Sequence, residues 1–181
     1  MRTVTLKDGS KLVIRRAVAA DAEQMAAFKT AIGRESDFLS YGEAEIEITP
    51  ETEKRGILAT EILENTVMLL ALLEEEIVGF VTFHSAARPR KKHGGELGIA
   101  VRQPYWGLGI GNLLMAALIS WAKDAKTVRK INLVTRADNA AAIRLYEKYG
   151  FVREGLLSRD VRINGKFYDG LLMGLPIDAE D

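Results

Sequence analysis

Three glycines alternate at positions 107, 109 and 111, where a segment with strand character ends and an amphipathic segment with helical character begins. Glycine adopts left-handed backbone angles at little steric cost and lets a ligand approach the main chain closely. The first turn of a helix carries unpaired N–H groups at the positive end of the helix dipole, which favours an anion. The segment therefore predicts a phosphate-binding turn made of Gly107, Leu108, Gly109, Ile110, Gly111 and Asn112.

The same glycines admit other interpretations. A dinucleotide-binding fingerprint needs a further glycine three residues after the second, a position that Asn112 occupies. The Gly-Lys-Ser/Thr ending of a P-loop is also absent from the sequence. A tight turn with no ligand stays open at this point, because glycine turns before helices are common.

Composition limits the class of protein. A chain of 181 residues suits one domain over 1–181. Lys plus Arg and Asp plus Glu number 25 each, so no overall charge attracts nucleic acid or an anionic membrane. The absence of cysteine excludes disulfides and an acyl-cysteine enzyme, and two histidines are too few for most zinc sites. With no visible targeting signal or membrane span, we expect a cytoplasmic protein that binds neither metal nor membrane.

Hydrophobic periodicity and turn residues predict an alternation of strands and helices. Asp8-Gly9 should close a first hairpin, Gly33 should end the first helix, Thr49-Pro50 should begin the second, and Asn164-Gly165 should close a last hairpin. The expected strands are 2–6, 11–16, 66–73, 77–84, 95–101, 130–135, 152–163 and 166–174, and the expected helices are 20–32, 50–64, 109–123 and 139–149. The residues 74–76 should form the turn between the third and fourth strands.

A second motif, over 138–151, follows a predicted strand, and together with the glycine turn it resembles the GNAT acetyltransferase superfamily. Members look like (Arg/Gln)-x-x-Gly-x-(Gly/Ala) on the turn and Asn-x-x-Ala-x-x-Leu-Tyr-x-x-x-Gly-Phe downstream. The matching positions are Gly109, Gly111, Asn139, Ala142, Leu145, Tyr146, Gly150 and Phe151. Trp106 departs from the pattern, because the family most often has Arg or Gln there.

The resemblance implies an α/β GNAT fold with its core over about 12–175: a mixed central sheet of about seven strands, flanked by about four helices, with an extra N-terminal strand or hairpin. It implies that acetyl-CoA lies in a cleft between the strand that contains Glu96 and the strand that contains Ile131. The pantetheine arm would contact the chain at Ile99, Ala100 and Val101, and the pyrophosphate would lie over the glycine turn. Asn139, Ala142 and Tyr146 would complete the cofactor site, and Asn139 should also cap its helix.

The family match also implies direct attack by an amine on the thioester, which needs an acid and a base. Tyr146 is the candidate acid, because a phenol can protonate a departing thiolate. Its helical spacing also fits plain core packing. Glu96 is the candidate base, at the strand that should face the thioester, and the alternative is an ordinary strand-edge carboxylate.

Two charged segments bear on the acceptor. Residues 35–53 carry seven carboxylates and no basic residue, which favours a cationic acceptor such as a polyamine, another small amine, an amino acid or a protein N-terminus, unless the segment is only a solvated face. The basic run from Arg88 to His93 precedes the Glu96 strand, far from the glycines, so we interpret it as a solvated loop.

Two further possibilities stay open. A non-catalytic sensor that binds acyl-CoA with the same fold is the alternative function, and Trp106 is its only hint. A homodimer that pairs through the last hairpin is possible, since this is frequent among GNAT relatives.

Overall fold

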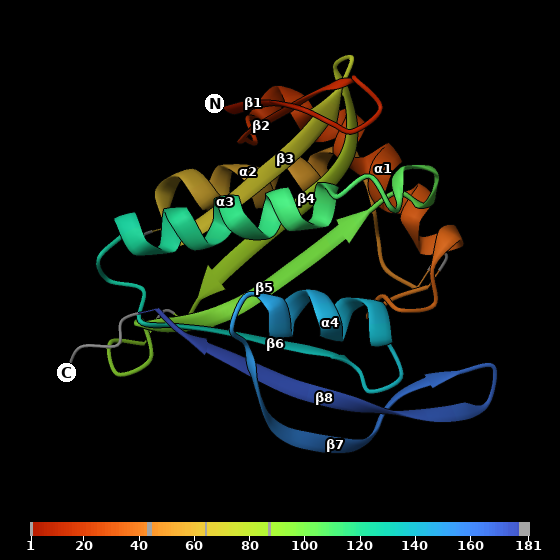
Figure 1. Cartoon of the computed structure of the whole chain (residues 1–181), viewed down its shortest axis with the longest axis vertical. Helices are drawn as coiled ribbons and strands as arrows, with labels where there is room; N and C mark the ends of the chain where they lie inside the picture. The colour runs from red at the N-terminus through yellow and green to blue at the C-terminus, as the bar shows by residue number, and fades with distance from the viewer. Residues whose placement is uncertain (1, 43–44, 64, 87, 178–181) are drawn as a thin grey trace.

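The computed structural model describes residues 2–42, 45–63, 65–86 and 88–177, whose backbone forms an eight-stranded sheet with helices on both faces (Figure 1). The strand order is β1-β2-β3-β4-β5-β6-β8-β7, and neighbouring strands are antiparallel except β5 and β6. The strands are β1 Arg2–Thr5, β2 Lys11–Arg16, β3 Thr66–Leu73, β4 Glu76–Ser85, β5 Gly94–Val101, β6 Lys130–Arg136, β7 Val152–Ile163 and β8 Lys166–Pro176. This mixed sheet confirms the predicted fold class.

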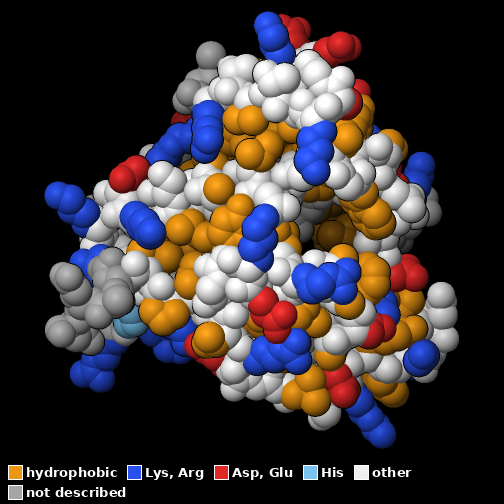
Figure 2. All heavy atoms as spheres, viewed as in Figure 1, with side chains coloured by type: hydrophobic (Ala, Val, Ile, Leu, Met, Phe, Trp, Pro, Cys, Tyr) orange, Lys and Arg blue, Asp and Glu red, His pale blue; other side chains and the backbone are white. Residues whose placement is uncertain are grey.

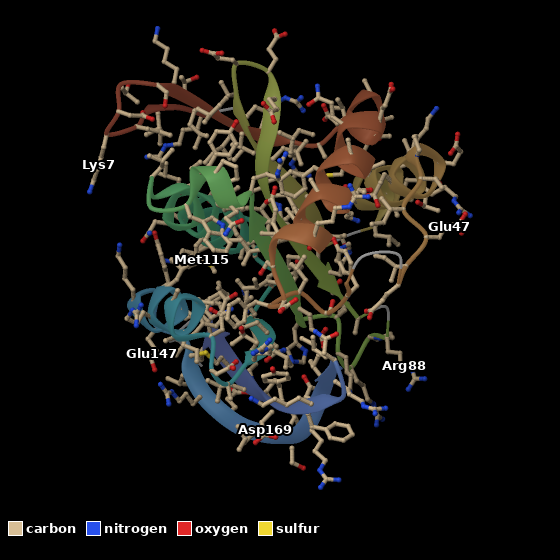
Figure 3. All side chains as sticks on the ribbon, turned by 90° about the vertical axis from the view of Figure 1, so that its right-hand side faces the viewer. Lys7, Glu47, Arg88, Met115, Glu147 and Asp169 are labelled. Atoms are coloured by element: carbon tan, nitrogen blue, oxygen red, sulfur yellow. The ribbon has the colours of Figure 1, made fainter. Side chains whose placement is uncertain are left out.

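The helices form two layers, one on each face of the sheet (Figure 3). On one face, α1 (Ala22–Glu35) and α2 (Pro50–Ile62) bury Met25, Phe28 and Ile57 against β3 and β4. On the other, α3 (Ile110–Asp124) and α4 (Ala140–Lys148) bury a larger cluster that includes Leu114 and Ile143. Short 3-10 turns at Ala19–Asp21 and Gln103–Tyr105 precede α1 and α3. Each amphipathic helix thus covers the sheet with its apolar stripe.

Most predicted boundaries are confirmed because the turn residues act locally. Gly9, Asn164 and Gly165 have φ values of 87°, 49° and 81°, as the two predicted hairpins require. The Thr49 side chain accepts a hydrogen bond from the Thr52 N–H at 3.1 Å, so Thr49 is the N-cap of α2 as predicted.

Two boundary predictions were wrong. Gly33 does not end α1, which continues to Glu35; a side chain at 33 would contact the Tyr41 ring, so glycine there accommodates the segment packed over the helix. Glu76 lies in β4 rather than in the preceding turn, because Glu74 and Glu75 alone supply the two positive φ values of that hairpin, 48° and 70°.

A partly buried ion pair holds the start of α1 to β2. Two 2.7 Å hydrogen bonds join the Arg15 guanidinium to the Asp21 carboxylate, and the Val18 N–H donates to the same carboxylate at 2.8 Å. The bonds from Arg15 hold the pKa of Asp21 below its ordinary value, against the opposing effect of burial, and the bond from Val18 adds to them.

We expect Asp21→Asn to lower the free energy of unfolding by roughly 2 kcal/mol near neutral pH, since Arg15 loses its ionic partner. A folded pKa below the unfolded one stabilises the protein above the unfolded pKa, and this contribution is lost as the pH falls through the folded pKa. Urea unfolding should therefore show a smaller difference between wild type and variant near about pH 3 than near about pH 7. Equal differences at both values, or an equal loss in the exposed Asp124→Asn control, would contradict this role.

Candidate active site

The sheet opens between β5 and β6. These strands pair only over Gly94–Lys130, Gly95–Ile131 and Glu96–Asn132, and beyond this point the two strands diverge (Figure 1). The Arg102 N–H donates to the Val78 carbonyl of β4 at 3.0 Å. Because main-chain groups alternate in direction along a strand, those of Leu97, Ile99 and Val101 face the open edge.

Of the three β5 residues predicted to contact the pantetheine arm, two therefore present main-chain groups to this opening. Ile99 and Val101 do so, whereas the main chain of Ala100 faces β4 and its side chain packs on the α1 and α2 side. In the space-filling view, the surface is hollowed between α3 and α4, with hydrophobic side chains at the bottom of the hollow (Figure 2).

The glycine turn stands at the mouth of this opening. Gly107 and Gly109 have φ values of 81° and 84°, and a Cβ at either position would meet no atom within 4 Å. The Leu113 N–H bonds to the Gly109 carbonyl at 3.2 Å, and in the described structure the N–H groups before it, from Ile110 to Asn112, have no protein acceptor. Open space and free N–H groups at a helix N-terminus suit an anion. Gly111 differs, since a Cβ there would touch Leu145 of α4 at 3.4 Å, so it serves helix packing.

Trp106 has a structural role that the sequence did not reveal. Its indole N–H donates to the Val101 carbonyl at 2.7 Å, and this bond ties the turn to the end of β5. Lys148 of α4 was also missed: its ammonium group donates to the Asn112 side chain at 2.6 Å and so brings a cation to the first turn of α3. The Tyr149 hydroxyl donates to the Asn112 carbonyl at 2.7 Å. Lys148 ends α4 and Tyr149 is its C-cap, and no local pattern predicts that both meet Asn112, which is 36 residues or more away along the chain.

Helix α4 carries the candidate acid. The Asn139 side chain accepts a hydrogen bond from the Ala142 N–H at 3.2 Å, so the predicted cap is confirmed. Tyr146 is 7% exposed, and its ring packs on Phe151 with 5.8 Å between centroids. Burial raises the pKa of Tyr146 to about 12. Core packing and a functional hydroxyl are thus compatible in this residue.

The Tyr146 hydroxyl makes no hydrogen bond to the described residues, but it is not fully enclosed by protein. Among the described residues it has no hydrogen-bond partner, and the only fully enclosed side-chain polar atom without a partner in that part of the chain is the Tyr41 hydroxyl. The Tyr146 oxygen therefore reaches accessible space and can bond to a molecule that enters it.

Glu96 lies at the point where β5 leaves β6. Its cross-strand neighbours are His84 on β4 and Asn132 on β6, and all three line an open pocket of about 670 Å³. Partial desolvation by the surrounding protein lowers the pKa of His84, and the Lys29 cation adds to this effect. By alternation along β5, Glu96 faces the α1 and α2 side, opposite to Leu97.

The acidic segment is partly neutralised. Glu35 bonds to Arg102 at 2.7 Å, and Glu53, which is buried, bonds to Lys29 at 2.8 Å. Glu47 lies at the periphery of the molecule (Figure 3). Glu43 lies outside the described residues.

Arg136, at the end of β6, joins the segment after α1 to β8. Its guanidinium bonds to Asp138 at 2.7 Å and to the Asp37 carbonyl at 3.1 Å, and it lies 3.7 Å from the Tyr168 ring centroid. Asp138 is only two residues away, but the contacts with Asp37 and Tyr168 could not be predicted, because these partners are distant along the chain.

The comparisons with known proteins agree on one family. The profile described as the acetyltransferase (GNAT) family matches residues 35–151. An L-amino acid N-acetyltransferase from Escherichia coli is 33% identical over 58% of this chain and 65% of its own length, and an N-alpha-acetyltransferase from Sulfurisphaera tokodaii is 35% identical over 48% and 50%. The chain thus matches between half and two thirds of these relatives' length.

Solved structures extend the likeness to nearly the whole chain. An acetyltransferase of the GNAT family from Streptococcus pneumoniae has a TM-score of 0.89 and 35% identity, covering 92% of this chain and 99% of that one. A Salmonella typhimurium structure, solved with its cofactor acetyl-CoA, shares the fold with a TM-score of 0.84 and 19% identity over 93% and 95%.

The described residues contain neither a membrane-spanning helix nor a cluster of metal ligands. None of their helices has the length and apolar character needed to cross a membrane, and they hold no group of three or more His, Cys, Asp or Glu side chains suited to a metal ion. The family profile matches more than half of the sequence, and the fold agrees with a solved member of that family. Members of this family use acetyl-CoA. The chain belongs to the GNAT family of acetyltransferases.

Proposed function

We propose that this protein transfers an acetyl group from acetyl-CoA to a primary amine, in a complex that holds both substrates at once. The observation that carries the proposal is the opening of β5 from β6 beside the glycine turn, with Tyr146 and Glu96 on the elements that border it. Relatives of this chain are named as acetyltransferases of L-amino acids, of spermidine and of N-alpha amino groups, which supports an amine acceptor.

The donor side fits acetyl-CoA in three respects. The free N–H groups from Ile110 to Asn112 can bind phosphate oxygens, and Lys148 adds a positive charge beside them. The open edge of β5 offers the main-chain groups of Ile99 and the N–H of Val101 to the amides of a pantetheine arm, since the Val101 carbonyl already accepts a hydrogen bond from Trp106. Ala142, half-buried at the start of α4, and Asn139 stay candidate contacts of the same site.

Acetyl-CoA supplies an activated thioester, and Tyr146 would stabilise the sulfur that leaves. A phenol with a pKa of about 12 stays protonated at neutral pH, so it is a hydrogen-bond donor. Full proton transfer to a thiolate of ordinary pKa, about 8.5, would be uphill by roughly 5 kcal/mol. The apolar surroundings that raise the pKa of Tyr146 also disfavour a bare thiolate, which narrows this gap.

Glu96 would accept the proton of the attacking amine, directly or through one water. It lines the pocket on the α1 and α2 side of the sheet, at the residue where β5 and β6 part. An amine in this pocket would reach the thioester through the opening between the strands. The acceptor and donor would thus approach from opposite faces of the sheet.

The sensor alternative depended on Trp106. Because its indole bonds to the Val101 carbonyl, this residue has a reason to be present that does not concern catalysis. That contact favours the enzyme over the sensor.

Initial rates measured while both substrates are varied test the proposal. We expect intersecting double-reciprocal lines for the wild type, since both substrates must be bound together, and parallel lines would contradict the complex. Glu96→Gln should lower kcat/KM for the amine by about 100-fold, because the base is lost, without changing acetyl-CoA affinity. The exposed Glu61→Gln control should match the wild type, and an equal effect in both variants would remove Glu96 from the mechanism.

A further inference from the structure

We propose that the amine acceptor carries a carboxylate, as a free amino acid does, and that Lys91 binds it. This inference rests on the proposed function and specifies its substrate class. The basic run from Arg88 to His93, interpreted from sequence as a solvated loop, is indeed exposed. Two of its side chains, Lys91 and His93, nevertheless line the pocket that contains Glu96.

The charges of this pocket are unlike those of the acidic segment. Its lysines are Lys91 and Lys130, and its one carboxylate is Glu96. Lys130 is already paired, since it bonds to Glu154 at 2.8 Å. Lys91 has no ionic partner among the described residues. One cation and one carboxylate are thus available to a ligand in the pocket.

Main-chain hydrogen bonds hold Lys91 in the turn that leads into β5. The Lys91 N–H donates to the Arg88 carbonyl at 2.8 Å, and its carbonyl accepts from the Gly94 N–H at 3.0 Å. Gly94 and Glu96 lie on the same face of β5, about 6.6 Å apart. The four-carbon stem of Lys91 extends from this turn to the pocket that Glu96 also lines. Arg88, at the outer end of the same loop, lies at the periphery instead (Figure 3).

This pair of charges matches an amino acid. Glu96 would face the amine, and Lys91 would face the carboxylate on the neighbouring carbon. A polyamine would instead bring a second cation towards Lys91, which is unfavourable. The acidic segment offers less to a cation than its sequence suggests, because Glu35 and Glu53 are already paired with Arg102 and Lys29. The E. coli relative named as an L-amino acid N-acetyltransferase agrees with this assignment.

A comparison of amino acids with their amides tests the assignment, since the amides keep the amine and lose the negative charge. We expect kcat/KM of the wild type to be at least about tenfold higher for the acids, the usual effect of a charged hydrogen bond. Lys91→Gln should raise KM for the acids by about tenfold and leave the amides unchanged. Lys92→Gln, next in the chain but outside the pocket, should behave as the wild type.

Each other outcome has a distinct meaning. If amides or polyamines are acetylated as well as the acids, or if Lys91→Gln and Lys92→Gln behave alike, the assignment of Lys91 is wrong while acetyl transfer stands. If no amine of any charge is acetylated, the proposed function itself fails.

Discussion

Tyr146→Phe should lower kcat by about 100- to 1,000-fold, the usual contribution of a general acid. The substitution removes only the hydroxyl, which has no protein partner among the described residues, so the fold should not lose a hydrogen bond. The ring contact with Phe151 is kept. The affinity for acetyl-CoA should change little, because the hydroxyl acts on the sulfur only as it leaves. Steady-state assays give kcat, and calorimetric titration with acetyl-CoA gives the affinity, so the effects on catalysis and on binding are measured separately.

Tyr105→Phe is the matched control for this experiment. The Tyr105 hydroxyl makes one long contact, 3.5 Å from Glu76 at the start of β4, rather than with a residue of the proposed cleft. Its loss should leave kcat within about twofold of the wild type. If Tyr146→Phe also keeps its kcat, the residue is a core side chain and water protonates the thiolate.

Gly109→Ala should weaken acetyl-CoA binding by about 10- to 100-fold, the effect of losing one or two hydrogen bonds to a charged group. At φ 84° a methyl group strains the backbone, and it would enter the open space beside the free N–H groups of α3. Phosphate oxygens could then no longer approach the turn closely. Calorimetric titration with acetyl-CoA gives the dissociation constant directly.

Gly9→Ala supplies a control with the same backbone strain. Gly9 has a φ of 87° and, like Gly109, no atom within 4 Å of a new Cβ, but it lies in the β1–β2 turn. Both variants should lose about 1 kcal/mol of folding free energy. Only Gly109→Ala should lose acetyl-CoA affinity, and an equal affinity in the two variants would show that the turn does not bind the phosphates.

Local signals in the sequence were enough for much of the fold. Thr49 caps α2, Asn139 caps α4, and Asn164-Gly165 closes the last hairpin, because each acts on residues within one turn of itself. The end of α1 was predicted wrongly, because Gly33 makes room for the Tyr41 ring packed over the helix and does not end the helix.

The parts of the site that depend on tertiary contacts were not predictable in this way. From the sequence, Trp106 is only a departure from the family pattern, because its hydrogen bond to the Val101 carbonyl depends on the folded turn. The sequence predicts a solvated loop for the basic run, since only the folded loop brings Lys91 to the pocket that contains Glu96. The sequence does not show how much of the negative charge of the segment 35–53 is available to a cation, because the burial of Glu53 against Lys29 is a tertiary contact.

Acetyl-CoA-dependent release of free thiol, measured with amino acids, amino-acid amides, polyamines and N-terminal peptides, tests the central claim most directly. We predict thiol release that requires an amine, with an equal amount of acetylated amine detected by mass spectrometry. Tight binding of acetyl-CoA without thiol release on the whole panel would contradict the claim and would make the protein a sensor.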